Sequence, residues 1–100
     1  MTIVKKLDTH PYANCKVFER EMRDIHTGEA IGRIFVLRSY ATDVVTVRET
    51  DKAWGIHCDG LYSMTTRRHI GWFLQDIGCP FTYRDAKRAY ERDCYIEISK

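Results

Sequence analysis

The chain has 100 residues, and its 16 Lys and Arg against 14 Asp and Glu give a net charge of +2 at neutral pH. Hydrophobic residues make up 44% and charged residues 30%, which is the balance of a folded domain and excludes a disordered chain. No apolar run approaches the roughly 20 residues that cross a bilayer, and no apolar segment of a signal peptide follows the first lysines. We therefore expect one cytoplasmic domain over residues 1–100.

The first half of the chain has the pattern of β-strands. Residues 15–24 are polar and predict an edge strand, which leaves open a homodimer formed by pairing with a second copy. The apolar residues 34–37 predict a central strand that is covered on both faces. Residues 43–50 are rich in β-branched side chains and predict the next strand.

A hairpin turn is predicted at residues 49–53, before a short strand in which apolar and other residues alternate. In that strand we expect Trp54, Ile56 and Cys58 to point inward and His57 to point outward.

After Gly60 the periodicity becomes helical. Four apolar residues at positions i, i+3, i+4 and i+7 predict the buried face of an α-helix: Ile70, Phe73, Leu74 and Ile77. Gly78 and Pro80 predict where this helix ends.

A second helix is predicted to start at Thr82, because Thr82 and Asp85 have the spacing of a capping box. Its narrow packing face is predicted at Ala86, Ala89 and Tyr90. A last strand follows, with Cys94, Ile96 and Ile98 on one side. We therefore expect an α+β fold: an antiparallel sheet of four to five strands, two consecutive helices on one face, and a final strand.

The predicted helices carry the positive charge of the chain. Residues 66–92 contain six Lys and Arg against three Asp and Glu. The candidate binding residues are these six and a neighbouring histidine: Arg67, Arg68, His69, Arg84, Lys87, Arg88 and Arg92. At the start of the first helix, arginines beside free backbone amides favour an anion, but the same residues also fit an ordinary capped and solvated helix start. In the second helix, the i, i+4, i+8 spacing predicts one basic stripe, which fits nucleic acid, an acidic protein surface or a solvated face.

No catalytic motif is present: the chain has no Gly-rich phosphate loop, no H-E-x-x-H and no nucleophile elbow. The four cysteines include no Cys-x-x-Cys pair, and we expect them to be buried free thiols. His57 and Cys58 are adjacent, but in a strand they point to opposite faces and cannot easily share a metal. We expect no catalytic residue, no metal and no cofactor, although pairs of Cys and His that meet only in space stay open.

Two segments, SYATDVV at residues 39–45 and YSMTTRRHIGWFL at residues 62–74, resemble a core found in small, mostly uncharacterised proteins of bacteriophages and mobile elements. The positions that match are Tyr40, Thr42, Tyr62, Ser63, Thr65, Thr66 and His69. The resemblance implies a phage or prophage origin. For a small protein without a catalytic motif it implies an interaction protein, such as an inhibitor of a host defence nuclease of the anti-CRISPR type. The alternative is a nucleic-acid-binding regulator that uses the basic helix pair.

Overall fold

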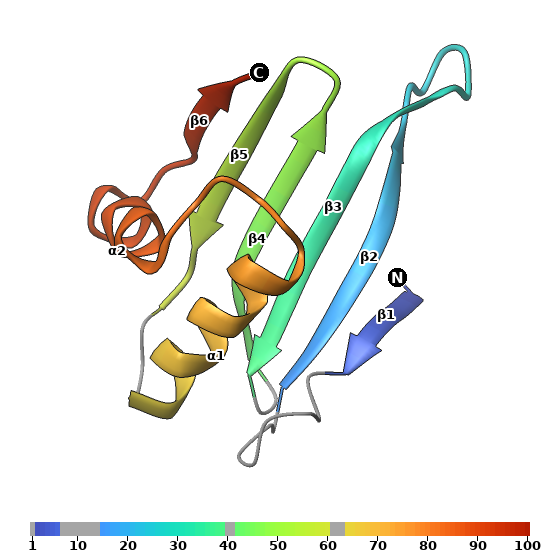
Figure 1. Ribbon diagram of the computed structural model, residues 1–100. Helices are drawn as coiled ribbons and strands as arrows, with labels where there is room; N and C mark the ends of the chain where they lie inside the picture. The colour runs from blue at the N-terminus through green and yellow to red at the C-terminus, as the bar shows by residue number, and fades with distance from the viewer. Residues whose placement is uncertain (1, 7–14, 40–41, 61–63) are drawn as a thin grey trace.

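A computed structural model of the chain describes residues 2–6, 15–39, 42–60 and 64–100. The elements, in chain order, are β1 (Thr2–Lys6), β2 (Cys15–Arg23), β3 (Ala30–Ser39), β4 (Thr42–Thr50), β5 (Ala53–Cys58), α1 (Met64–Asp76), α2 (Tyr83–Arg92) and β6 (Ile96–Ser99). The strands form one six-stranded sheet in which each strand pairs with its neighbours in sequence, and every pair is antiparallel. Both helices lie on one face of this sheet (Figure 1), so the predicted α+β fold is confirmed.

The sheet has one strand before the first strand that we predicted. β1 pairs with the first half of β2, and β3 pairs with β2 along its length. The prediction that residues 15–24 form an edge strand is therefore wrong for the half of β2 that β1 covers, and pairing with a second copy stays a prediction. The polar residues of β2 have another cause: Glu19 and Glu21 lie in register with Phe35 and Arg33 of β3, and their carboxylates bind arginines.

The core lies between the sheet and the helices. One row of side chains crosses four strands in register on this side: Val17, Leu37, Val45 and Cys58. The next row along the sheet adds Phe35, Val47, Ile56 and Ile96. From α1, Ile70, Phe73 and Leu74 are at most 2% exposed against these rows, which confirms the predicted face of the helix at these three positions. The fourth predicted residue, Ile77, follows the end of α1 and is only partly buried. Each buried side chain of this size contributes about 1.5–3 kcal/mol, so α1 is firmly held on the sheet.

The central strand β3 is covered by helices on one face rather than on both. Phe35 and Leu37 face the helices, whereas Ile34 and Val36 are in register with Arg48 and Thr46 on the other face. In the described part of the chain, no helix packs on that second face (Figure 1). The apolar run correctly predicted the central position of β3, but it does not report how many layers the fold has.

The second helix begins as predicted. The backbone N–H of Thr82 donates to Asp85 Oδ2 at 2.8 Å, which is one arm of the capping box. Ala86 and Ala89 are fully buried, but Tyr90 is 45% exposed and lies outside the packing face that was predicted for it. The two alanines let α2 approach the sheet closely only along a narrow line, which leaves the bulky Tyr90 at its border.

The last strand is shorter than expected. β6 begins at Ile96, so Cys94 precedes it and is exposed rather than buried. Of the described helices, none has the length and apolar character needed to cross a membrane.

Candidate functional site

The structure places most of the predicted binding residues at the outer surface of the two helices. On α1, Arg67 and Arg68 are exposed, whereas His69 is fully buried against the sheet. His69 is therefore not part of an external binding surface, which corrects the prediction at that residue. The reason is helical geometry: His69 lies three positions after the buried Thr66 and four before the buried Phe73, so it shares their inward side.

On α2, four basic side chains point away from the sheet. Opposite the buried Ala86 and Ala89, the exposed residues are Arg84, Lys87, Arg88 and Arg92. Residues four apart in a helix are about 6 Å apart along its axis, so three of the guanidinium groups form a regular stripe over two turns. Together with Arg67 and Arg68, these residues are called the helix surface below.

The cations of the helix surface are not used inside the fold. In the described part of the chain, the ion pairs of arginine residues involve Arg23, Arg33 and Arg38 only. On α2, the carboxylate of Asp85 is turned back to cap the helix, and that of Glu91 is exposed. Exposed cations without a partner repel one another weakly and create a positive potential in front of the helices.

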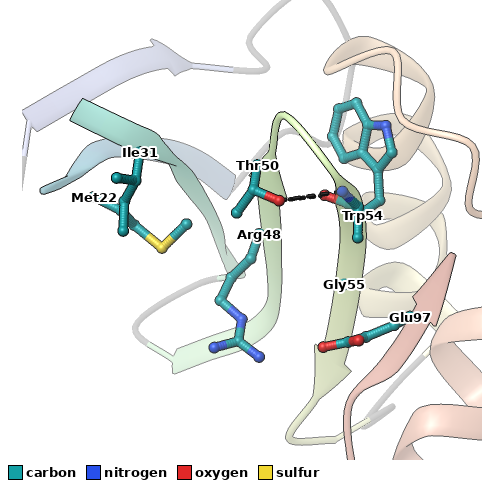
Figure 2. A pocket seen from close by; sticks show the side chains of 8 residues that line it. Met22, Ile31, Arg48, Thr50, Trp54, Gly55 and Glu97 are labelled. Carbon is teal, nitrogen blue, oxygen red and sulfur yellow. Dashed lines mark hydrogen bonds between the residues drawn. The ribbon is translucent and has the colours of Figure 1, made fainter. Parts of the chain in front are cut away.

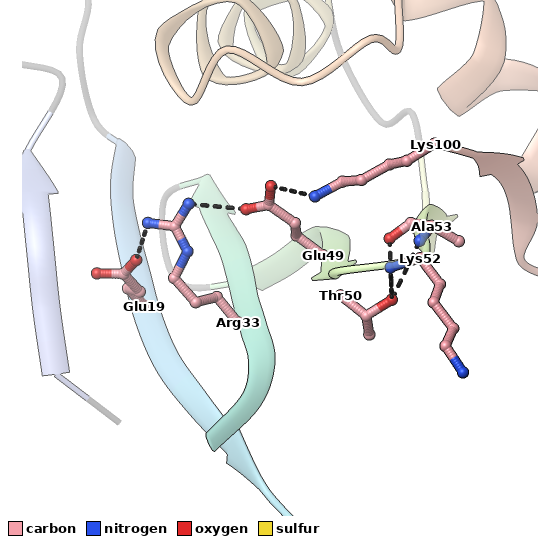
Figure 3. Close-up of polar contacts among 7 residues, drawn as sticks. All are labelled: Glu19, Arg33, Glu49, Thr50, Lys52, Ala53 and Lys100. Atoms are coloured by element: carbon pink, nitrogen blue, oxygen red, sulfur yellow. Dashed lines mark hydrogen bonds and ion pairs between the residues drawn. The ribbon is translucent and has the colours of Figure 1, made fainter. Parts of the chain in front are cut away.

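A network of ion pairs on the sheet joins charged residues of three strands to the last residue of the chain. Arg33 binds Glu19 at 3.2 Å and Glu49 at 2.7 Å, and Lys100 binds Glu49 at 2.8 Å (Figure 3). The hydrogen bond from Lys100, aided by Arg33, holds the pKa of Glu49 below its ordinary value of 4.5, against the effect of partial burial. This network ties the C-terminus to β2, β3 and β4, so its charges are structural.

A buried polar cluster joins α1 to the end of β3. Ser39 Oγ lies 2.8 Å from His69 Nδ1 and 3.3 Å from Thr66 Oγ1, and none of the three residues is more than 3% exposed. We call these three residues the polar joint. Buried polar groups need such partners, because an unpaired one costs about 1–3 kcal/mol.

The polar joint connects the two segments on which the phage resemblance rests. Ser39 begins the first segment, and Thr66 and His69 belong to the second. Of the other matching positions, Thr42 begins β4, Tyr40, Tyr62 and Ser63 lie outside the described residues, and so does the side chain of Thr65.

A serine hydroxyl bonded to an imidazole has the contact that a nucleophile and its base require. Here both groups are buried, at 3% and 0% exposure, and a reacting atom needs access to the hydroxyl. The arrangement favours a structural role: it fixes the position and rotation of α1 on the sheet.

The four cysteines are free thiols. Cys15 and Cys58 are buried. Burial raises the pKa of the Cys15 thiol to about 11, which disfavours the reactive thiolate form. His57 and Cys58 point to opposite faces as expected, because they are in register with Thr46 and Val45 respectively. Among the described residues, no three His, Cys, Asp or Glu side chains are grouped so that they could hold a metal ion.

A profile of the family of unknown function DUF8033 matches residues 5–95 of the chain. The chain belongs to the DUF8033 family. No curated protein and no solved structure matches it. The DUF8033 match spans the helix surface, the polar joint and strands β2 to β5, and so includes N-terminal strands that the sequence resemblance did not cover.

Two features of this DUF8033 chain were not found from the sequence. One is Ser39 as the partner of His69, since a contact across 30 positions has no local pattern. The other is a pair of arginines stacked on aromatic rings on the face of the sheet away from the helices. The alternation of β2, β3 and β4 places Phe18, Arg38 and Arg48 on one face and was the signal that could have indicated it.

Proposed function

We propose that the chain is a non-enzymatic interaction protein that uses the helix surface to bind an acidic patch on a partner protein. The single observation that carries this proposal is that six exposed cations on two adjacent helices have no ion pair within the described chain. Positive potential of this kind increases the rate of encounter with an acidic surface and selects against basic partners.

The partner that we propose is a protein of the cell in which the chain acts, with a host defence nuclease as the leading candidate. The support for a phage origin and for a cytoplasmic site of action is the sequence resemblance alone. The positive charge of the helix surface restricts how such an inhibitor could bind its target. A basic surface cannot mimic nucleic acid, so it would dock on acidic groups, such as the carboxylates that hold catalytic metal ions in many nucleases.

The proposal is tested by capture from host lysate, after nuclease treatment to remove bridging nucleic acid. The bait proteins are the wild type, a variant with Arg84→Glu and Arg88→Glu, and a control with Lys52→Glu. Lys52 is an exposed cation in the turn between β4 and β5, far from the helix surface.

We expect the wild type and the Lys52→Glu control to retain one protein in stoichiometric amount, and the double variant to lose it. The partner should also dissociate as salt is raised, because exposed charges are screened over about 10 Å at 0.1 M salt. Capture that survives Arg84→Glu with Arg88→Glu, or no stoichiometric protein at all, contradicts the proposal.

The second candidate function is binding of duplex nucleic acid by the same surface. The observation that favours it is the stripe of three guanidinium groups at intervals of about 6 Å, which suits a row of phosphates. If this function is correct, affinity for duplex DNA falls steeply with salt, and Arg88→Ala weakens binding equally for all sequences. Binding that does not depend on salt excludes it.

A further inference from the structure

The outer edge of β2 is covered by another strand along only part of its length. β1 pairs with residues 16–19 of β2, and Thr2 lies opposite Glu19. Among the described residues, no strand lies beside Arg20–Arg23 on this side (Figure 1). An uncovered strand edge is a template for pairing with another strand. We call residues 20–24 the free edge of β2.

The backbone of the free edge directs hydrogen-bonding groups outward. Asp24 directs its own groups toward the β3 side: its N–H donates to Glu29 O at 2.9 Å, and its C=O accepts from the N–H of Gly28 at 2.8 Å. Backbone groups alternate in direction along a strand, so those of Glu21 and Arg23 point away from β3. Each of these two residues therefore offers one donor and one acceptor to an added strand.

The order of charges along the free edge is complementary to itself. The sequence Arg20-Glu21-Met22-Arg23-Asp24 reads positive, negative, neutral, positive, negative. If a second copy lies antiparallel around a two-fold axis at Met22, Arg20 faces Asp24 of the other copy and Glu21 faces Arg23. Every charge of the free edge then lies opposite a charge of the other sign, which stabilises a pair of strands.

The same charges exclude the neighbouring symmetric registers. A two-fold axis at Glu21 places two carboxylates opposite each other, and an axis at Arg23 places two guanidinium groups opposite each other, which destabilises the pairing. Charged edges usually keep sheets apart. Here one register avoids the repulsion, and in that register Glu21 and Arg23, whose backbone groups point outward, are cross-strand partners. The charges and the backbone hydrogen bonds therefore select the same register.

Within one copy these charges have weak partners. Arg23 Nη2 lies 2.6 Å from Glu21 Oε2, but the two side chains are 60% and 51% exposed, and such surface pairs contribute little to stability. Arg20 is exposed and has no ion pair with any residue that the structure describes. Asp24 accepts hydrogen bonds from two N–H groups of the following turn through Oδ1, and Oδ2 is left for a second copy. The side chains of the free edge can therefore exchange their partners between copies.

An apolar contact lies at the centre of the same pairing. On the face of the sheet away from the helices, Met22 and Ile31 border one side of a hollow of about 250 Å³ (Figure 2). Met22 is partly exposed and Ile31 is 48% exposed. Cross-strand partners point to the same face of a sheet, so the two Met22 side chains meet at the two-fold axis. The flexible thioether adapts to such a contact, and the hollow gives it room.

We propose that the free edge of β2 pairs with the free edge of a second copy, antiparallel around a two-fold axis at Met22. The pairing joins two six-stranded sheets into one continuous sheet. A strand of an unrelated protein could use the backbone groups, but it would not account for the self-complementary order of the charges. The helix α2 packs on β5 and β6, at the other side of the sheet, so this inference does not rest on the function proposed for the helix surface.

Sedimentation equilibrium of the whole chain up to about 1 mM tests the pairing, because one strand edge buries less than the roughly 1,000 Å² of a stable interface. We expect the average mass to rise from 11.8 kDa toward twice that value as the concentration increases. Glu21→Arg or Arg23→Glu alone places like charges opposite each other, and we expect each to weaken the dimer at least about tenfold. The double variant restores opposite charges in the same register, so its dimer should be within about threefold of the wild type in affinity.

Two variants with the same changes of charge elsewhere are the controls: Glu91→Arg on α2 and Lys52→Glu in the turn between β4 and β5. Both should dimerise as the wild type does. The proposal is overturned if the wild type stays monomeric over the whole range, if neither single change weakens the dimer, or if the double variant fails to restore it. Assembly that continues beyond a dimer also overturns it, because a two-fold pairing is closed.

Disulfide cross-linking locates the two-fold axis. Facing residues whose backbone groups point away from each other have Cα atoms about 4.5 Å apart, within the roughly 4.4–6.8 Å that a disulfide spans. In a Cys94→Ser background, which removes the exposed native thiol, Met22→Cys should form a covalent dimer under mild oxidation. Ser99→Cys, exposed on β6 at the other edge of the sheet, should stay monomeric. Cross-linking of Ser99→Cys in place of Met22→Cys overturns the proposal, and no result here changes what the capture experiment on the helix surface is expected to show.

Discussion

The change Ser39→Ala should destabilise the fold by removing the centre of the polar joint. Ser39 is 3% exposed, and its hydroxyl lies 2.8 Å from His69 Nδ1 and 3.3 Å from Thr66 Oγ1. Alanine takes up the remaining space but cannot accept or donate a hydrogen bond, and His69 has no access to water that could replace it. Loss of a partner by a buried polar group costs about 1–3 kcal/mol.

This loss can be measured by urea unfolding followed by circular dichroism, with Ser99→Ala as the control. Ser99 is the exposed last residue of β6, and its truncation should cost less than about 0.5 kcal/mol. In a domain of this size each kcal/mol lowers the melting temperature by about 4–8 °C. The reasoning is refuted if Ser39→Ala is as stable as Ser99→Ala. It is also refuted if Ser39→Ala and His69→Phe are simply additive, because contacting residues are coupled by about 0.5 kcal/mol or more.

Two further predictions follow from the charges and thiols. The pKa of Glu49 is lowered in the folded state by Lys100 and then Arg33, so its contribution to stability is present above its ordinary pKa of 4.5 and is lost as the pH falls through the lowered value. Urea unfolding between about pH 5 and pH 3 should therefore show a shallower loss for Glu49→Gln than for the wild type, and equal slopes would exclude the effect. Exposed Cys94 should react with iodoacetamide in the native protein, whereas Cys15 should react only after denaturation; mass spectrometry that finds Cys15 labelled first contradicts its burial.

The elements that the sequence predicted are those with a strong local pattern. The spacing of Ile70, Phe73 and Leu74 predicted the buried side of α1, and Thr82 with Asp85 predicted the start of α2. Local periodicity is sufficient in these cases because it reflects the geometry of one element on one apolar surface.

What the sequence did not predict depends on contacts between distant segments. His69 looked like a surface residue beside two arginines, although its spacing from Phe73 places it on the inward side of α1; Ser39, 30 positions away, supplies the hydrogen-bond partner that its burial requires. The polar strand β2 was predicted to lie at the edge of the sheet because its neighbour β1 was not recognised. The sequence of β1 does not alternate between apolar and polar residues. Arg33 forms an ion pair with Glu49, whereas Arg88 forms none in the described chain. The sequence does not distinguish the two arginines, because the partner of Arg33 lies on another strand.

Lysine footprinting of the captured complex tests most directly whether the helix surface is where the partner binds. Acetylation by a water-soluble reagent, read by mass spectrometry, compares three exposed lysines in the free and bound protein: Lys87 on the helix surface, Lys16 on β2 and Lys52 in the turn. We predict that Lys87 alone becomes protected in the complex. Equal labelling of Lys87 in the free and bound protein, or protection of Lys16 in its place, would contradict the account.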